Sequence, residues 1–261
     1  MGDLRVDQAK LLRSFDLMKI PSDYVSYSFL SQLSFSDTIL NASADFQFVL
    51  DRDRLALLST RTRQQSPVFV DFSDRAFKRR LAAGLQGQLL GKALGLKTLR
   101  APNVLDATAG LGTDSFLMAN AGCLVTAIER SSAIFALLED GLRRAVQPGV
   151  ANEASSWVAS RIEIRREDFL VADLSDKTYD VVYLDPMFPA FRRKASSRKE
   201  MTMLQEIVSE DQCESALLSL ALQCAKRRVV VKRNRRSPDL AGAKPTFKLQ
   251  GSKSRFDVYC C

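Results

Sequence analysis

The strongest chemical signal in the sequence is a carboxylate directly after an apolar run. Residues 181–189 read VVYLDPMFP, in which Asp185 follows the apolar stretch. An ionised carboxylate beside a buried segment is costly unless it has a partner, which points to a functional role. Pro186 lacks an N–H and leaves its carbonyl free to accept, and Phe188 offers a flat ring. A planar base with an exocyclic amine would fit such a group, so the candidate catalytic residues are Asp185, Pro186 and Phe188. The alternative is a proline turn with a core phenylalanine.

A glycine-rich turn follows an earlier apolar run. Residues 106–114 read DATAGLGTD. Gly110 and Gly112 would let the backbone turn sharply and approach a ligand ahead of a helix N-terminus. The turn is not a dinucleotide fingerprint, because the third glycine of GxGxxG would fall on Ser115. By itself the turn fits either a cofactor site or a purely structural turn.

Acidic residues end the next two apolar runs. Glu129 closes one of them, where a carboxylate can accept hydrogen bonds from both hydroxyls of a ribose. The alternative is a solvated carboxylate at a strand end. Glu167 and Asp168 follow the other run and either border an adenine ring or begin a loop.

The composition excludes several kinds of chemistry. The 261 residues contain no histidine, which rules out Ser-His-Asp hydrolysis, HExxH metalloproteases, histidine-bound metals and imidazole catalysis. The five cysteines form no CxxC pair; Cys123, Cys213 and Cys224 lie in apolar stretches and are predicted to be reduced core residues. The charged N-terminal segment does not resemble a signal peptide, and no apolar run reaches the roughly 18 residues of a membrane span, which together predict a cytoplasmic protein.

From residue 103 onward, short apolar runs alternate with helical segments. This pattern predicts a Rossmann-like, doubly wound, mostly parallel α/β sheet, whose strand ends bind ligands. The expected strands lie at residues 103–107, 123–129, 161–165, 179–185, 227–232 and 255–260, and the expected helices at 132–145 and 209–225.

The N-terminal part follows a different pattern. Residues 44–72 predict a small β-meander whose third strand is the segment 66–72, after helices around 6–15 and 24–33. Asp74 is an N-cap candidate for a helix whose apolar spacing continues to residue 93, although glycines at 84, 87 and 91 weaken it. We therefore predict an α+β module over residues 1–74 and a second domain over residues 75–261.

In this order and spacing, DATAGLGTD, the AIER of residues 127–130 and YLDPMFP resemble the class I S-adenosylmethionine-dependent methyltransferases. DPMFP resembles a variant of the D/N-P-P-Y/F motif of methyltransferases that act on amino groups. More narrowly, the chain resembles the RsmJ family, which methylates the exocyclic N2 amine of a guanosine in small-subunit (16S) ribosomal RNA. The segments KEM at 199–201, RVVVKR at 228–233 and RFDVY at 255–259 support the match.

The resemblance implies S-adenosylmethionine as the cofactor and needs no metal. The family usually has an arginine where this chain has Thr113, and a small polar pair where it has Glu167 and Asp168. The cofactor-binding residues that the resemblance and the strand ends imply are Asp106, Gly110, Gly112, Thr113, Asp114, Glu129, Arg130, Glu167, Asp168 and Asp185.

The net charge of +8 is concentrated after the DPMFP segment. Between residues 192 and 236 there are twelve lysines and arginines and five acidic residues, a difference of +7. Basic residues beside a base pocket would bind RNA phosphates without reading sequence; the alternative is a solvated basic face. The predicted RNA-binding residues are Arg192, Arg193, Lys194, Lys199, Lys232 and Arg233.

Other functions remain open from the residues alone. The same cofactor could serve a DNA adenine or cytosine, or a different ribosomal RNA amine. A non-catalytic RNA-binding or ribosome-assembly module is a third possibility, although such a protein has no need of the Asp185 carboxylate. A nicotinamide dehydrogenase fits least, because Ser115 replaces the fingerprint glycine.

Overall fold

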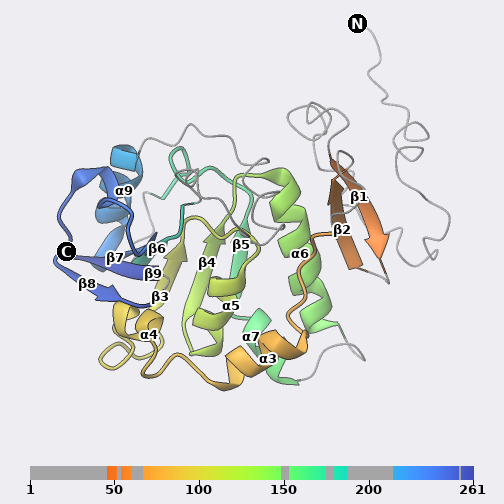
Figure 1. Ribbon diagram of the computed structural model, residues 1–261. Helices are drawn as coiled ribbons and strands as arrows, with labels where there is room; N and C mark the ends of the chain where they lie inside the picture. The colour runs from red at the N-terminus through yellow and green to blue at the C-terminus, as the bar shows by residue number, and fades with distance from the viewer. Residues whose placement is uncertain are drawn as a thin grey trace, which may run out of the picture.

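The computed structural model describes residues 46–51, 54–59, 67–147, 153–174, 179–186, 214–252 and 254–261. Its main sheet has seven strands in the order β5-β4-β3-β6-β7-β9-β8 (Figure 1). These strands are β3 (Asn103–Asp106), β4 (Leu124–Ile128), β5 (Ile162–Arg165), β6 (Tyr179–Leu184), β7 (Ala225–Asn234), β8 (Phe247–Gln250) and β9 (Ser254–Cys260).

The strand directions confirm the predicted Rossmann-like α/β fold. The strands from β5 to β7 pair in parallel, whereas β9 is antiparallel to both β7 and β8. The strand order reverses between β3 and β6, and ligands of doubly wound sheets bind at the carboxyl ends of strands at such a point. All six strands that the sequence predicts after residue 103 are present. β8 was not predicted, because only Leu249 of its four residues is even partly buried and no apolar alternation marks it.

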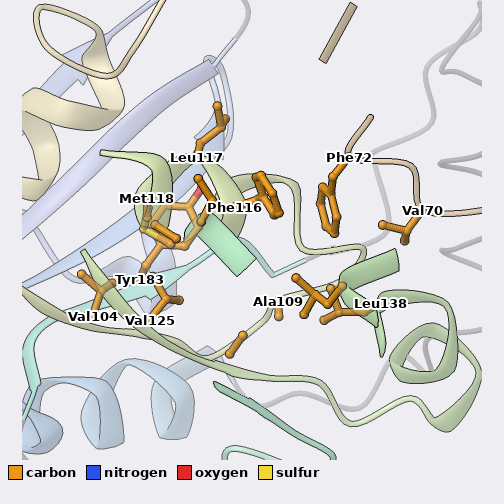
Figure 2. Packing of buried hydrophobic residues seen from close by; sticks show 14 of the residues in the cluster. Val70, Phe72, Val104, Ala109, Phe116, Leu117, Met118, Val125, Leu138 and Tyr183 are labelled. Atoms are coloured by element: carbon orange, nitrogen blue, oxygen red, sulfur yellow. The ribbon is translucent and has the colours of Figure 1, made fainter. Parts of the chain in front are cut away.

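The two faces of the sheet belong to two apolar cores. Along β6, Val181 and Tyr183 enter one core and Val182 and Leu184 the other, as the two-residue period of a strand requires. Figure 2 shows the first core, in which Phe116 lies between the sheet and Phe72. The helices that supply buried residues to this core are α4 (Leu89–Leu94), α5 (Thr113–Asn120), α6 (Ser132–Val146) and α7 (Glu153–Ala159), whereas α9 (Glu214–Cys224) supplies the second core.

The long helix expected after Asp74 is two helices. Asp74 is an N-cap as predicted, and its side chain accepts from the N–H groups of Ala76 and Phe77. The first helix, α3 (Arg75–Ala82), ends soon afterwards, and α4 begins only at Leu89. Gly84 and Gly87, between them, have φ values of +60° and +83°, which are left-handed conformations that interrupt a right-handed helix.

The N-terminal meander is confirmed in its first two strands only. β1 (Phe46–Asp51) and β2 (Arg54–Ser59) form an antiparallel hairpin, but the segment at 67–72 meets β2 through one bridge, from Val68 to Leu57. The buried residues that follow Val68 in this segment pack on α5 and α6 instead. Phe72 stacks on Phe116 with ring centroids 4.1 Å apart, and Gly141 of α6 lies so close to Val70 that a Cβ there would be 2.3 Å from its side chain.

The hairpin is also joined to α6 by polar contacts. The Leu55 N–H donates to the buried Asp140 carboxylate at 3.0 Å, and the Arg144 guanidinium donates to the Val70 carbonyl. The predicted boundary after residue 74 stays a prediction, and the helices expected at 6–15 and 24–33 lie outside the described residues. Cys123 and Cys224 are buried as predicted, whereas Cys213 lies outside the described residues.

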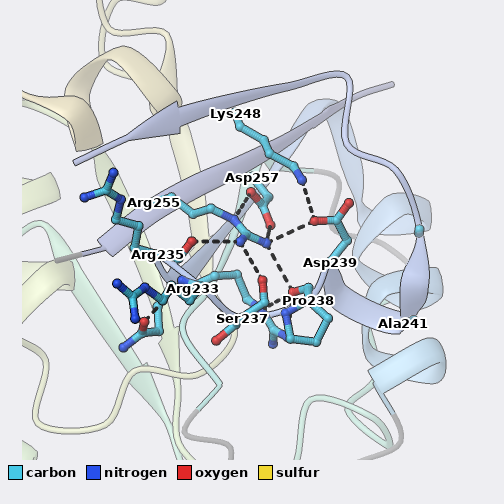
Figure 3. A network of polar contacts seen from close by, with 12 residues as sticks. Arg233, Arg235, Ser237, Pro238, Asp239, Ala241, Lys248, Arg255 and Asp257 are labelled. Atoms are coloured by element: carbon cyan, nitrogen blue, oxygen red, sulfur yellow. Dashed lines mark hydrogen bonds and ion pairs between the residues drawn. The ribbon is translucent and has the colours of Figure 1, made fainter. Parts of the chain in front are cut away.

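At the other edge of the sheet, Arg255 of β9 centres a polar network (Figure 3). Its guanidinium pairs with the buried Asp257 at 2.8 and 2.9 Å, and with Asp239 at 3.0 Å. It also donates to the carbonyls of the turn after β7, at Arg235, Ser237 and Pro238. The turn is therefore fixed to β9 through its backbone. Within the described ranges, no helix has the length and apolarity needed to cross a membrane.

Candidate active site

The carboxyl ends of β3, β6 and β7 bring together the residues with the strongest chemical signals. Asp106 is the last residue of β3, Asp185 directly follows β6, and Lys232 lies near the end of β7. Asp185 is held by its backbone, because its N–H donates to the Thr108 hydroxyl in the glycine-rich turn at 2.7 Å. The DP motif and the glycine-rich turn are therefore directly linked.

A single ammonium group bridges two carboxylates at this edge. Lys232 Nζ lies 2.7 Å from Asp185 Oδ2 and 2.7 Å from Asp114 Oδ2. Asp114 also accepts from the Tyr183 hydroxyl at 2.7 Å and from the Arg80 guanidinium at 3.2 Å. The Asp114 side chain is 10% exposed and that of Asp185 is 37% exposed, so Asp185 is the more accessible carboxylate.

The two carboxylates differ in their electrostatic surroundings. Burial raises the pKa of Asp185 above its ordinary value despite the charge of Lys232, and the facing Asp114 adds to the rise. Burial also disfavours the charge of Asp114, but Lys232 and the Tyr183 hydroxyl outweigh it and hold the pKa of Asp114 below its ordinary value. Lys232 thus favours the ionised form of both carboxylates, and Asp114 has the additional support of the Tyr183 hydroxyl and Arg80.

Asp106 is a third, fully buried carboxyl group. Burial raises its pKa to about 7, against the opposing hydrogen bond from the Ser115 hydroxyl at 2.5 Å. The Thr108 N–H also donates to it at 3.3 Å. These bonds fix the turn between β3 and α5, so Asp106 shapes the glycine-rich loop in addition to its predicted place near a cofactor.

The glycine-rich turn and Glu129 form a cradle that fits the predicted cofactor. Gly110 has a φ of +54°, and a Cβ there would meet nothing within 4 Å, so the backbone borders open space. Its N–H donates to Glu129 Oε2 at 2.9 Å, and the Ser131 N–H donates to Oε1 at 2.7 Å. A carboxylate oxygen can accept more than one hydrogen bond, so both oxygens can still receive ribose hydroxyls. Gly112 differs from Gly110, since a Cβ there would lie 2.4 Å from Leu138.

The acidic pair after β5 also fits a nucleoside. Arg165 donates to Glu167 Oε1 at 3.1 and 2.7 Å, whereas Glu167 Oε2 is buried and has no partner among the described residues. Such an oxygen is open to an N–H donor such as an adenine amine. Asp168 lies 4.0 Å from Arg130, which joins the ends of β4 and β5.

The remaining predicted residues are either beside the site, on the opposite face of the sheet, or outside the described ranges. Thr113 begins α5 and is exposed, while Pro186 is partly buried after Asp185. Arg233 is buried on the face opposite Lys232, where it contacts Glu214 at 3.4 Å and the Pro238 carbonyl at 3.0 Å. The predicted residues that lie outside the described ranges are Phe188, Arg192, Arg193, Lys194 and Lys199.

The sequence prediction did not identify the roles of Tyr183, Thr108 and Arg80. Tyr183 could have been found, because the residue two positions before Asp185 on a strand faces the same side. Thr108 lies in the glycine-rich turn and offers a hydroxyl at the right place. Arg80 had no such signal, since 34 positions separate it from Asp114. In the part of the chain that the structure describes, no group of histidine, cysteine or acidic residues is arranged to hold a metal ion.

Comparison with known proteins gives consistent matches over most of the chain. The sequence profile of a family described as SAM-dependent methyltransferase matches residues 31–261. A protein of Shewanella amazonensis named ribosomal RNA small subunit methyltransferase J is 42% identical over 226 residues, which cover 85% of this chain and 90% of that protein. A protein of the same name from Cellvibrio japonicus is 41% identical over 220 residues, covering 82% and 83% of the two chains.

A solved structure supports the same grouping. The crystal structure of a SAM-dependent methyltransferase from Neisseria gonorrhoeae is 36% identical to this chain, with a TM-score of 0.65. The match covers 84% of each chain.

Proposed function

Because this chain belongs to the S-adenosylmethionine-dependent methyltransferase family that includes the ribosomal RNA small subunit methyltransferase J proteins, we propose that it methylates the exocyclic N2 amine of a guanosine in small-subunit (16S) ribosomal RNA. S-adenosylmethionine is the methyl donor of the family. The names of the relatives support the RNA substrate. The choice of an amine as the methyl acceptor rests on the Asp185 carboxylate. This residue is partly exposed, and its backbone N–H donates to the Thr108 hydroxyl in the glycine-rich turn.

In this proposal, the ends of β3, β4 and β5 hold the cofactor. Glu129 would accept the ribose hydroxyls, Gly110 would let the backbone approach, and Glu167 Oε2 would accept from the adenine amine. The other proposed cofactor contacts are Asp106, Gly112, Thr113, Asp114, Arg130, Asp168 and Asp185. When bound, S-adenosylmethionine supplies a methyl group on a sulfonium, whose departure leaves a neutral thioether.

The protein's own task is to prepare the amine. The lone pair of a guanine amine is delocalised into the ring, so the nitrogen is a weak nucleophile. Hydrogen bonds from the amine to the Asp185 carboxylate and the Pro186 carbonyl would favour a pyramidal nitrogen and stabilise its developing positive charge. Once the nitrogen carries the methyl group, its surplus proton would pass along the hydrogen bond to the Asp185 carboxylate and from there to solvent. Such prearranged acceptors stabilise the transition state without reorganisation. Phe188 would stack on the base and hold the nitrogen in line with the methyl group.

The remaining cations would hold the RNA backbone. Arg192, Arg193, Lys194 and Lys199 follow the base pocket in the sequence and would contact phosphates, which makes the affinity for RNA strongly salt-dependent. Arg233 could join them only by leaving Glu214 and the Pro238 carbonyl. The same proposal divides the chain into a module over residues 1–74 and a methyltransferase domain over residues 75–261. It also places the protein in the cytoplasm, where ribosomal RNA is found.

The test is a transfer assay with labelled S-adenosylmethionine. Purified protein is incubated with naked 16S ribosomal RNA, with intact small subunits and with DNA, and the product nucleoside is identified by mass spectrometry. We expect N2-methylguanosine from one or both RNA substrates. Methyladenine or methylcytosine from DNA would favour the other acceptors, and RNA binding without transfer would favour an assembly module.

A further inference from the structure

Lys232 lies between two carboxylates, although it was expected to face the RNA. Its ammonium is 2.7 Å from both Asp114 Oδ2 and Asp185 Oδ2, and its side chain is only 29% exposed. Both contacts cross between elements, because Lys232 belongs to β7, Asp114 to α5, and Asp185 follows β6. An ammonium held at two sites in this way is poorly placed to bind phosphate.

The strand register explains why the lysine reaches both acids. β6 and β7 pair in parallel, with Leu184 opposite Val231, so Lys232 and Asp185 are the next residues on adjacent strands. Asp114 enters from the first turn of α5 and is held in place by the Tyr183 hydroxyl and by Arg80. The position of the ammonium therefore follows from the strand register and from α5.

The charges at this point do not balance without Lys232. Asp114 and Asp185 both bind the same ammonium, and their charges also reach the buried Asp106 and raise its pKa. Arg80 reaches only the far oxygen of Asp114. Two carboxylates that face each other without a cation between them cannot both remain ionised at neutral pH.

We propose that Lys232 is a positioning residue for the methyl transfer: it fixes Oδ2 of Asp185 and leaves Oδ1, in the ionised carboxylate, to accept a hydrogen bond from the target amine. This inference rests on the proposed function. Thr108 fixes the backbone of Asp185 from one side, and Lys232 fixes its side chain from the other. Lys232 acts through Asp185 and does not itself touch the substrate.

The proposal predicts a specific change in pH dependence. Transfer requires ionised Asp185, so the rate falls on the acidic side as this carboxylate becomes protonated. Lys232 lowers the pKa of Asp185, whereas burial and Asp114 oppose its ionisation. Removal of the ammonium therefore raises the pKa of Asp185 and moves the acidic limb of the pH–rate profile to higher pH.

The experiment compares three variants of the full chain at saturating S-adenosylmethionine. Lys232→Met removes the charge and keeps most of the side-chain volume, and we expect kcat at neutral pH to fall by about 10²-fold. Lys232→Arg keeps the charge and should return the acidic limb towards its wild-type position. Lys248→Met is the matched control, because Lys248 also pairs with an acid, Asp239, at 2.6 Å but on β8. It should keep the wild-type kcat and profile.

A second readout does not depend on activity. Aspartate carboxyl groups labelled with ¹³C are titrated by NMR in the free wild-type protein and in Lys232→Met, with Asp185→Asn to assign the Asp185 signal. The expected result is a higher titration midpoint for Asp185 in Lys232→Met, with thermal melting confirming that the variant is folded. An unchanged midpoint would overturn the role of Lys232, whatever the enzyme methylates.

The two readouts separate the possible failures. If wild-type protein methylates RNA but Lys232→Met keeps the wild-type profile, the positioning role is wrong and the proposed function stands. If the midpoint moves but no RNA amine is methylated, Lys232 controls Asp185 as proposed and the assigned reaction is wrong. If Lys232→Met changes only the salt dependence of RNA binding, Lys232 is a phosphate contact and the inference is overturned.

Discussion

Two adjacent cations on β7, Lys232 and Arg233, face opposite sides of the sheet and enter two different charge clusters. On one side, Arg233, Arg255 and Lys248 meet Glu214, Asp257 and Asp239, so three cations face three acids. On the other side, Lys232 and the half-exposed Arg80 serve Asp114 and Asp185, with the buried Asp106 nearby.

The two clusters differ in how completely their charges are satisfied. Arg255 has carboxylate or carbonyl acceptors on every side, and the Asp257 beneath it is fully buried (Figure 3). The Lys232 cluster has an excess of acid and leaves Asp185 partly exposed. A balanced cluster centred on a buried arginine has its charges satisfied within the protein and leaves none for a ligand. An unbalanced one next to an opening can receive a cationic or hydrogen-donating ligand, at some cost in stability.

The largest expected effect lies in the balanced cluster. Arg255→Met should lower the free energy of unfolding by about 3–5 kcal/mol, because it leaves Asp257 buried without its partner and takes from the Arg235 and Ser237 carbonyls the donor that Arg255 supplies. Urea denaturation measures the change. Lys248→Met, which breaks a more exposed pair, should cost only about 0–1 kcal/mol. Equal losses in the two variants would mean that burial does not distinguish these pairs.

In the unbalanced cluster the effect should fall on catalysis. Asp185→Ala should lower the rate of methyl transfer by roughly 10²–10³-fold, because the amine loses its charged acceptor. Lys232 still pairs with Asp114 in this variant, so stability should not decrease. Single-turnover assays give the rate, and calorimetry should show that S-adenosylmethionine still binds. Transfer at the wild-type rate would remove Asp185 from the mechanism.

The free energy of unfolding should depend on pH because of the buried carboxyl group of Asp106. The pKa of Asp106 is raised to about 7 by burial, above the roughly 3.9 of an unfolded aspartate. The folded state therefore keeps a proton that the unfolded state releases, and the stability from this group is complete at low pH and is lost as the pH rises to about 7. The slope reaches at most about 1.4 kcal/mol per pH unit.

Asp106→Asn tests that slope, because it keeps the shape and removes the titration. Urea denaturation of the variant between pH 5 and 8 should show a weaker loss of stability with rising pH than the wild type. Arg255→Met is the comparison, since Arg255 lies in the other charge cluster and its loss leaves Asp106 unchanged. Parallel curves for wild type and Asp106→Asn would show that Asp106 is already ionised at pH 5.

Within the Lys232 cluster, the smallest effect is expected for Tyr183→Phe. The hydroxyl donates to Asp114 at 2.7 Å, and its loss should cost about 1 kcal/mol of stability. The transfer rate should fall several-fold, because Asp114 then holds Lys232 less firmly. Denaturation and steady-state kinetics measure the two changes. A loss as large as that of Asp185→Ala would mean that Tyr183 contacts the reacting groups directly.

Much of the fold could be predicted from local patterns. The predicted strands match β3 to β7 and β9 because each is an apolar run bounded by polar residues or glycine, and Asp74 caps α3 as expected. The sequence predicted a third strand in the meander, where the structure has only one bridge, because the apolar Val70 and Phe72 suit a strand as well as they suit packing on a helix. They pack on α6 and α5 because Gly141 and Phe116 offer a close fit there, which only the tertiary structure brings near.

The sequence alone indicated the kind of chemistry: the absence of histidine excluded imidazole catalysis, and the resemblance carried by the glycine-rich turn and the DPMFP segment predicted a cofactor-dependent transfer to an amine. It also determined the strands that place those residues at one edge, because strand periodicity is a local property. The tertiary structure decided the partners of the charges. Lys232 and Arg233 are neighbours with the same charge, and the pleat of β7 directs one to Asp185 and the other to Glu214, acids that are 47 and 19 positions away in the chain. Such contacts depend on strand register and helix position, which no local pattern encodes.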